Sequence, residues 1–258
     1  MTAKEIIEHM ESLRNDEQRR ILMQFFKTGS GEYGEGDEFL GLKVPQTREV
    51  VKSVEKETKL NEIPQLLASK WHEVRLCGLL LMVSKFEKLA TRRLINDSNA
   101  ISQRDEILNM YLHHAEQANN WDLVDLSAPK ILGHWLLLPT LLGSNANITE
   151  REYKQEVVDS LAESDNLWRQ RMSVVCTLRT LQEGDPSWCL RYSEKLLHHP
   201  HDLMHKAVGW MLREMGKRVS VDLLRSFLSE HAATMPRTTL RYAIEKMPYA
   251  ERHYWMKR

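Results

Sequence analysis

Residues 75–83 read Arg-Leu-Cys-Gly-Leu-Leu-Leu-Met-Val, and the apolar Leu76, Leu79, Leu80 and Val83 recur in this stretch at helical intervals. Residues spaced three and four apart lie on one face of an α-helix, whereas a half-buried strand alternates apolar and polar residues. The same helical spacing recurs near both ends of the chain, in residues 6–13 and 223–228. No segment of comparable length alternates, so the sequence predicts an all-α protein.

Several helix starts are marked by their own residues. Thr2 with Glu5, and Thr149 with Glu152, have the pattern of a capping box, in which hydroxyl and carboxylate bind free amides of the first turn. Proline also favours the first helical position, because an amide donor is not needed there. We expect three prolines to mark helix starts in this way: Pro45, Pro186 and Pro236.

A short pattern inside the predicted helices repeats along the chain. It consists of a charged residue, an apolar residue and then mostly small residues, and it begins at Arg75, Asp125, Arg171, Lys206 and Arg241, at intervals of 50, 46, 35 and 35 residues. These intervals fit HEAT-type repeats, whose helices bury their apolar faces by stacking on their neighbours. The sequence therefore predicts a curved superhelical solenoid of stacked antiparallel HEAT-like helix pairs, forming a single domain over residues 1–258. The five charged side chains are expected to project from its concave side.

Composition excludes several other classes of protein. The three cysteines, Cys77, Cys176 and Cys189, form no Cys-x-x-Cys pair and are odd in number, which favours buried thiols in a reducing compartment over a disulfide framework. The N-terminus is charged and amphipathic, and no stretch approaches the roughly 20 apolar residues of a membrane span. We therefore expect a cytoplasmic protein that is not inserted in a membrane.

The charge of the chain is balanced overall but unevenly distributed. Residues 1–166 hold 20 lysines and arginines against 27 acidic residues, whereas residues 167–258 hold 16 against 9. A net charge of zero speaks against indiscriminate coating of nucleic acid, because that affinity comes from many phosphate contacts. The basic C-terminal part is the end that a polyanion would prefer.

Two aromatic residues stand one helical turn from repeat positions. Trp121 precedes Asp125 by four residues, so ring and carboxylate share a helical face, and Trp210 has the same spacing from Lys206. Cations can hold phosphates, while a carboxylate and π faces can stabilise a sugar that develops positive charge. A tryptophan in a helix is, on its own, more often a core residue, and an isolated charge is usually just solvated.

Four sequence elements together resemble the HEAT-like-repeat DNA alkylation repair enzymes, the alkylpurine DNA glycosylases of AlkD type. They occur in the family's order and span most of the chain: Phe39-Leu-Gly-Leu-Lys-Val-Pro45, Trp121-Asp-Leu-Val-Asp125, Trp168-Arg-Gln-Arg171 and Lys206-Ala-Val-Gly-Trp-Met-Leu-Arg-Glu214.

The resemblance implies hydrolysis of the N-glycosidic bond of N3-alkyladenine and N7-alkylguanine in duplex DNA. It implies that Trp121, Asp125 and Trp210 surround the deoxyribose as catalytic residues and that Arg171 holds backbone phosphate. It also implies stabilisation of an oxocarbenium-like sugar without a base-flipping pocket, a metal or a cofactor. By position alone, four further DNA-binding residues are predicted: Lys206, Arg213, Arg75 and Arg241. We expect a monomer that associates with the nucleoid when bound to DNA.

The sequence departs from the family pattern in the Gly-rich acidic segment 29–38, which is a candidate for a substrate-facing flap. Four acidic side chains and the missing Lys-Ser/Thr argue against a phosphate-binding loop. The family's N-terminal aromatic has two candidates here, Phe26 and Tyr33. The histidines of residues 198–205 lack a suitable thiolate or carboxylate partner and favour a polar turn over a metal site. Pro129 is expected to interrupt the helix that carries Asp125.

Two other functions fit the same sequence. A non-catalytic binder of damaged or branched DNA would use the cations and ignore Asp125. A helical scaffold for protein partners would have an exposed apolar groove and no affinity for DNA.

Overall fold

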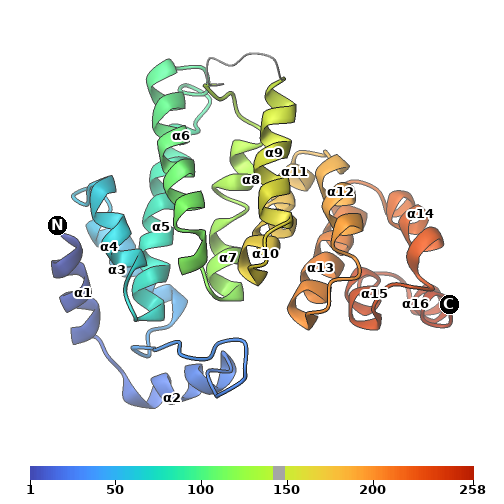
Figure 1. Ribbon diagram of the computed structural model, residues 1–258, viewed down its shortest axis with the longest axis horizontal. Helices are drawn as coiled ribbons and strands as arrows, with labels where there is room; N and C mark the ends of the chain where they lie inside the picture. Colours follow the sequence, from blue (N-terminus) through green and yellow to red (C-terminus); the bar gives the residue numbers. More distant parts are fainter. Residues whose placement is uncertain (142–148) are drawn as a thin grey trace. The chain divides into compact units, whose positions relative to one another are not determined.

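The computed structural model describes residues 1–141 and 149–258 (Figure 1). The chain divides into two compact units: unit 1 is residues 1–127 with 139–141, and unit 2 is residues 128–138 with 142–258. The described residues are helices and connecting segments, with one isolated parallel bridge between Glu38 and Trp71. This confirms the predicted all-α class. The predicted solenoid curvature and the single domain stay predictions.

Unit 1 is built around one central helix, α5 (His72–Leu89). Its other helices are α1 (Ala3–Ser12), α2 (Asp16–Phe25), α3 (Val44–Val54), η1 (Leu60–Glu62), α4 (Ile63–Leu67), α6 (Ser98–His113), η2 (Ala115–Gln117) and α7 (Trp121–Ser127). Helices α3, α4, α6 and α7 all pack against α5. Because α5 has neighbours on several sides, even its charged residues Glu73 and Arg75 are buried.

Unit 2 has a corresponding central helix, α13 (Asp202–Arg218). The other helices are α8 (Leu132–Trp135), α9 (Glu150–Ala162), α10 (Leu167–Val175), α11 (Thr177–Gln182), α12 (Ser187–Lys195), α14 (Val221–His231), α15 (Arg237–Ala243) and α16 (Tyr249–Met256). Helix α13 packs against α10, α11, α12, α14 and α15. A Cβ on Gly209 would lie 2.6 Å from the carbonyl oxygen of Thr239, so α15 can approach α13 this closely only at a glycine.

The predicted helix starts agree with the structure to within one residue. Both capping boxes are formed, at Thr2 and at Thr149. Pro45 is the second residue of α3, while α12 and α15 begin directly after Pro186 and Pro236. As predicted, the helix that carries Asp125 ends before Pro129, at Ser127.

The structure also shows where the cysteines and the histidine-rich segment lie. All three cysteines are buried and free, as predicted. None of the described helices is long and apolar enough to span a bilayer. His198, His199 and His201 lie in the turn before α13, whereas His205 lies in its first turns. The Nδ1 atom of His201 accepts a hydrogen bond from the amide of Leu203 at 3.1 Å, which caps the helix.

Residues 39–45 form a fixed junction between α2, α3 and α5. The carboxylate of Glu73 accepts hydrogen bonds from the amides of Leu40, Gly41 and Leu42 at 2.8, 2.8 and 3.0 Å. Gly41 has a φ of 92°, and a Cβ there would lie 2.1 Å from the carbonyl oxygen of Asn15. The glycine and the buried glutamate together hold this segment against the first turn of α5.

Candidate active site

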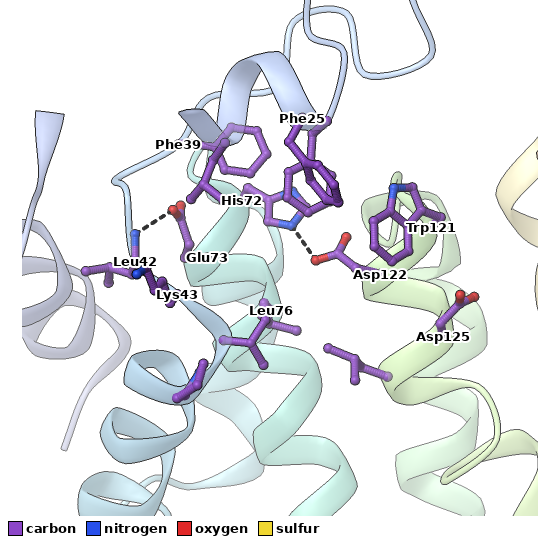
Figure 2. A pocket seen from close by; sticks show the side chains of 15 residues that line it. Phe25, Phe39, Leu42, Lys43, His72, Glu73, Leu76, Trp121, Asp122 and Asp125 are labelled. Carbon is purple, nitrogen blue, oxygen red and sulfur yellow. Dashed lines mark hydrogen bonds and ion pairs between the residues drawn. The ribbon is translucent and has the colours of Figure 1, made fainter. Parts of the chain in front are cut away.

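Trp121 and Asp125 lie on successive turns of the short helix α7 (Figure 2). The helix begins at Trp121, whose amide donates to the side-chain oxygen of Asn120 at 2.9 Å. Both Trp121 and Asp125 are half-buried, and both line the same cavity of unit 1. The shared face that the four-residue spacing predicted is therefore present.

An aromatic cluster covers one side of this cavity. Phe26 stacks on Trp121 with ring centroids 5.4 Å apart, and Phe25 meets the same indole edge-on at 6.0 Å. Phe26 also stacks on Phe39 at 5.1 Å, and Phe39 stacks on the ring of His72 at 4.4 Å. Of the two candidates for the N-terminal aromatic, Phe26 is the residue that contacts Trp121. Phe25, the preceding residue, contacts the same indole ring.

The ring of His72 lies between two carboxylates. Its Nδ1 atom is 2.8 Å from a carboxylate oxygen of Asp37, and its Nε2 atom is 2.9 Å from Oδ2 of Asp122. Burial lowers the pKa of His72, but ion pairing with Asp122 and Asp37 outweighs burial and raises the pKa to about 9. Both ring nitrogens then act as donors, so His72 is an imidazolium that joins segment 29–38 to α7.

Asp37 has a second cationic partner in Arg75. The Arg75 guanidinium donates to Asp37 and to the backbone carbonyls of Ser69 and Lys70. Burial raises the pKa of Asp37, but the hydrogen bond and charge of His72, with those of Arg75, lower it to below its ordinary value. Two carboxylates and two cations thus form a buried, neutral network. It fixes the C-terminal end of segment 29–38, the candidate flap.

The cavity itself has a volume of about 440 Å³. Its walls come from α2, the junction 39–45, α5 and α7, all in unit 1 (Figure 2). It is lined by Leu22, Phe25, Phe26, Phe39, Leu42, Lys43, Val44, Pro45, His72, Glu73, Leu76, Trp121, Asp122, Asp125 and Leu126. The lining is mostly apolar and aromatic with a few charged groups, which is the usual character of a small-molecule site.

Asp122 has one satisfied and one unsatisfied oxygen. Its Oδ2 atom is bound to His72, whereas its Oδ1 atom is buried and has no hydrogen-bond partner among the described residues. A buried carboxylate oxygen without a donor is uncommon and calls for an explanation. Asp122 also lines the cavity, and its link to His72 ties α7 to α5 at the cavity wall.

The predicted cations do not share one environment. Arg75 and Arg171 are each only 5% exposed, and Arg171 donates to the carbonyl of Leu203. Lys206 is half-buried and pairs with Asp202 at 2.7 Å, whereas Arg241 is exposed. The five repeat positions are therefore not a uniform exposed row, and the phosphate contacts of these side chains stay predictions.

The other predicted residues of unit 2 lie on α13. Trp210 is half-buried, and Arg213 forms an ion pair with Glu245. A groove of about 460 Å³ is lined by Asp202, Lys206, Thr238, Arg241, Tyr242 and Glu245. The grouping of Trp210 with Trp121 and Asp125 around a sugar stays a prediction.

Four residues of the unit 1 site were not predicted from the sequence: Phe25, Asp37, His72 and Asp122. Asp122 lies inside the Trp121–Asp125 element, but of the two acidic residues there only Asp125 shares a helical face with Trp121, so the sequence does not single out Asp122. Asp37 is one of the four acidic residues of segment 29–38, and nothing in the sequence distinguishes it from the other three. Its partners His72 and Arg75 lie 35 and 38 residues further along the chain, beyond the reach of local patterns.

Comparisons with known proteins identify the family. The sequence model of the family described as DNA alkylation repair enzyme matches residues 6–247. A search of curated proteins finds no match. Among solved structures, the fold is similar to a predicted DNA alkylation repair enzyme from Enterococcus faecalis, with a TM-score of 0.61 and 13% identity over 92% of this chain and 97% of that chain. The family match covers nearly the whole sequence, so this chain belongs to the DNA alkylation repair enzyme family.

Proposed function

We propose that this protein is a DNA glycosylase that hydrolyses the N-glycosidic bond of cationic alkylpurines, N3-alkyladenine and N7-alkylguanine, in duplex DNA. Family membership gives repair of alkylated DNA as its role. The observation that supports the finer proposal is the pair Trp121 and Asp125, half-buried on one face of α7 and open to a common cavity.

The departing purine base requires little assistance from the protein. An alkylated purine of this kind carries a positive charge, so it is a good leaving group. When the C1′–N bond breaks, its electron pair neutralises the purine ring, and positive charge develops on the deoxyribose. A carboxylate and an aromatic face beside the sugar lower the energy of this oxocarbenium-like state. These are the roles that we assign to Asp125 and Trp121.

Water completes the reaction. Its oxygen bonds to C1′ and it loses a proton, for which the Asp125 carboxylate is the acceptor in our proposal. The products are the free alkylpurine and an abasic deoxyribose in the DNA strand. No metal or cofactor is needed to balance these steps.

Unit 2 supplies the DNA-binding part of the proposal. We assign phosphate contacts first to Lys206 and Arg241, which line the groove between α13 and α15. The exposed guanidinium of Arg241 is the better placed of the two for a phosphate, because Lys206 already pairs with Asp202. Trp210 and Arg171 keep the roles that the family resemblance implies.

Base-release chromatography tests the proposal. Purified protein is incubated with methylated duplex DNA, and the released bases are separated and measured. We expect free N7-methylguanine and N3-methyladenine with an equal amount of abasic sites. Intact alkylated DNA under conditions where a gel shift shows binding would favour the non-catalytic DNA binder. Absence of both release and binding would favour the scaffold for protein partners.

A further inference from the structure

We propose that one exposed face of α16 binds single-stranded DNA, by stacking a base on a tyrosine and by contacting phosphates with cations. We call this surface, made up of Tyr249, Arg252, His253 and Lys257, the α16 face. None of these residues lines either of the two cavities described above. The proposal therefore goes beyond the proposed function and does not depend on it.

Helical spacing puts these four residues on one side of α16. Arg252 and His253 follow Tyr249 by three and four residues, and Lys257, at the C-terminal cap, follows His253 by four. All four residues are exposed. The helix packs against α15, and its buried residue is Trp255, which is not part of this face. The α16 face is therefore turned towards water and takes no part in the core of unit 2.

The face offers an aromatic ring to a base. Tyr249 is the most exposed of the large apolar and aromatic side chains that the structure describes, at 75%. Its ring is nearly parallel to the imidazole of His253, at an angle of 11° and with centroids 6.2 Å apart. Proteins that bind single strands commonly stack the bases on aromatic side chains. Tyr249 is the side chain that we assign to this role.

The charges of the face suit a polyanion. Arg252 and Lys257 form no ion pair with any residue that the structure describes. The one acidic residue of α16 is Glu251, and Arg225 already donates to its two carboxylate oxygens at 2.8 and 3.1 Å. The cations of the face are therefore available to phosphates, because the nearest carboxylate on the helix has another partner.

The ring and the cations together favour a single strand over a duplex. In a duplex the π faces of the bases are covered by their neighbours, whereas an unpaired strand offers each base to an aromatic side chain. Cations alone would bind either form through its phosphates. An apolar protein partner is disfavoured, because charged residues surround Tyr249 on this face. Since the family is described by the repair of DNA, we assign DNA as the strand.

Fluorescence anisotropy with a labelled oligothymidylate tests the proposal. This probe contains no purine, so the reaction proposed at α7 takes no part. Tyr249→Ala should weaken binding at least about fivefold, as expected for the loss of one stacked base. Equal binding by this variant and the wild type, or no binding by the wild type, overturns the proposal.

Tyr254 on the same helix provides the matched control. It is 48% exposed but follows Tyr249 by five residues, which puts it on a different side of α16, and the guanidinium of Arg258 lies 5.0 Å from its ring centroid. Tyr254→Ala should change the affinity less than about twofold. An equal loss in the Tyr249 and Tyr254 variants would contradict the assignment to the α16 face.

Further variants separate stacking from charge. Tyr249→Phe keeps the ring and should bind within about twofold of the wild type, whereas a loss as large as that of Tyr249→Ala would contradict stacking. The double variant Arg252→Ala and Lys257→Ala should make the log–log salt dependence shallower by about 0.7 for each phosphate that is no longer bound. An unchanged slope would contradict the phosphate contacts. Thermal melting of all variants checks that the fold is kept.

Discussion

The central helices of the two units place different charged residues beside the cavities that they line. At the start of α5, His72, Glu73 and Arg75 are buried, and each has partners within unit 1. On α13, Lys206 and Arg213 are half-buried and pair with Asp202 and Glu245, which are exposed. Buried, mutually neutralised charges hold a geometry, whereas charges near water can exchange partners. The charges at the start of α5 are therefore suited to a fixed site, whereas Lys206 beside the groove of unit 2 can exchange partners.

The largest effect on stability is expected at Arg75. Arg75→Met removes one partner of a buried ion pair and leaves Asp37 with less compensation, so the free energy of unfolding should fall by about 3–5 kcal/mol. Denaturant titration gives this value. Arg241→Met in unit 2 is the matched control and should change little, because Arg241 is exposed. Similar losses in the free energy of unfolding in both variants would contradict the difference that we describe between the buried Arg75 and the exposed Arg241.

A smaller effect is expected from the titration of His72. Its pKa is raised from 6.5 to about 9, so the folded state binds the proton more tightly than the unfolded chain. The resulting stabilisation is complete below about pH 6.5, is lost as pH rises towards 9, and amounts to about 3 kcal/mol. The charged groups facing this ring are Asp37 and Asp122, and Arg75 faces Asp37.

Unfolding free energies measured from pH 6 to pH 9 check this expectation. His72→Gln keeps hydrogen-bonding capacity but has no titratable proton, so it should be less stable at low pH and should lack this pH dependence. An equal slope in wild type and variant would mean that His72 is not the imidazolium that joins Asp37 to Asp122.

The smallest effect concerns DNA affinity in unit 2. Lys206→Ala and Arg241→Ala should each weaken binding a few-fold and make the salt dependence shallower by about 0.9 in log–log slope for each phosphate that is no longer bound. Lys4→Ala, at a side chain 79% exposed in unit 1, is the control and should leave the slope unchanged. Salt titrations by fluorescence anisotropy measure these slopes. Slopes that do not move in either unit 2 variant would refute the assignment of this groove to phosphate.

Local sequence was sufficient to predict several helix starts and the shared helical face of Trp121 and Asp125. A capping box, such as those at Thr2 and Thr149, involves only residues of one helical turn. A proline at a helix start is an equally local signal, so both can be recognised in the sequence without knowledge of the fold. The same holds for Trp121 and Asp125, because helical geometry alone puts residues four apart on one face.

The burial of individual residues and the walls of the cavity depend on contacts between segments that are distant in the sequence. Arg75 and Arg241 open the same short pattern, yet one is 5% exposed and the other is exposed, because only Arg75 meets a buried carboxylate, that of Asp37. In the same way, Phe26 contacts Trp121 across 95 residues of sequence. The cavity arises from such contacts among α2, α5 and α7, and no local pattern describes it.

The rate of base release by Asp125→Asn tests the central proposal most directly. The substitution keeps the size of the side chain and removes its charge. In single-turnover reactions on methylated duplex DNA, we expect the rate to fall by about 10²–10³-fold, the range seen when one electrostatic contact to a transition state is removed. DNA affinity and melting temperature should stay close to those of the wild type. A variant that binds the same DNA and releases base at the wild-type rate would contradict the role of Asp125.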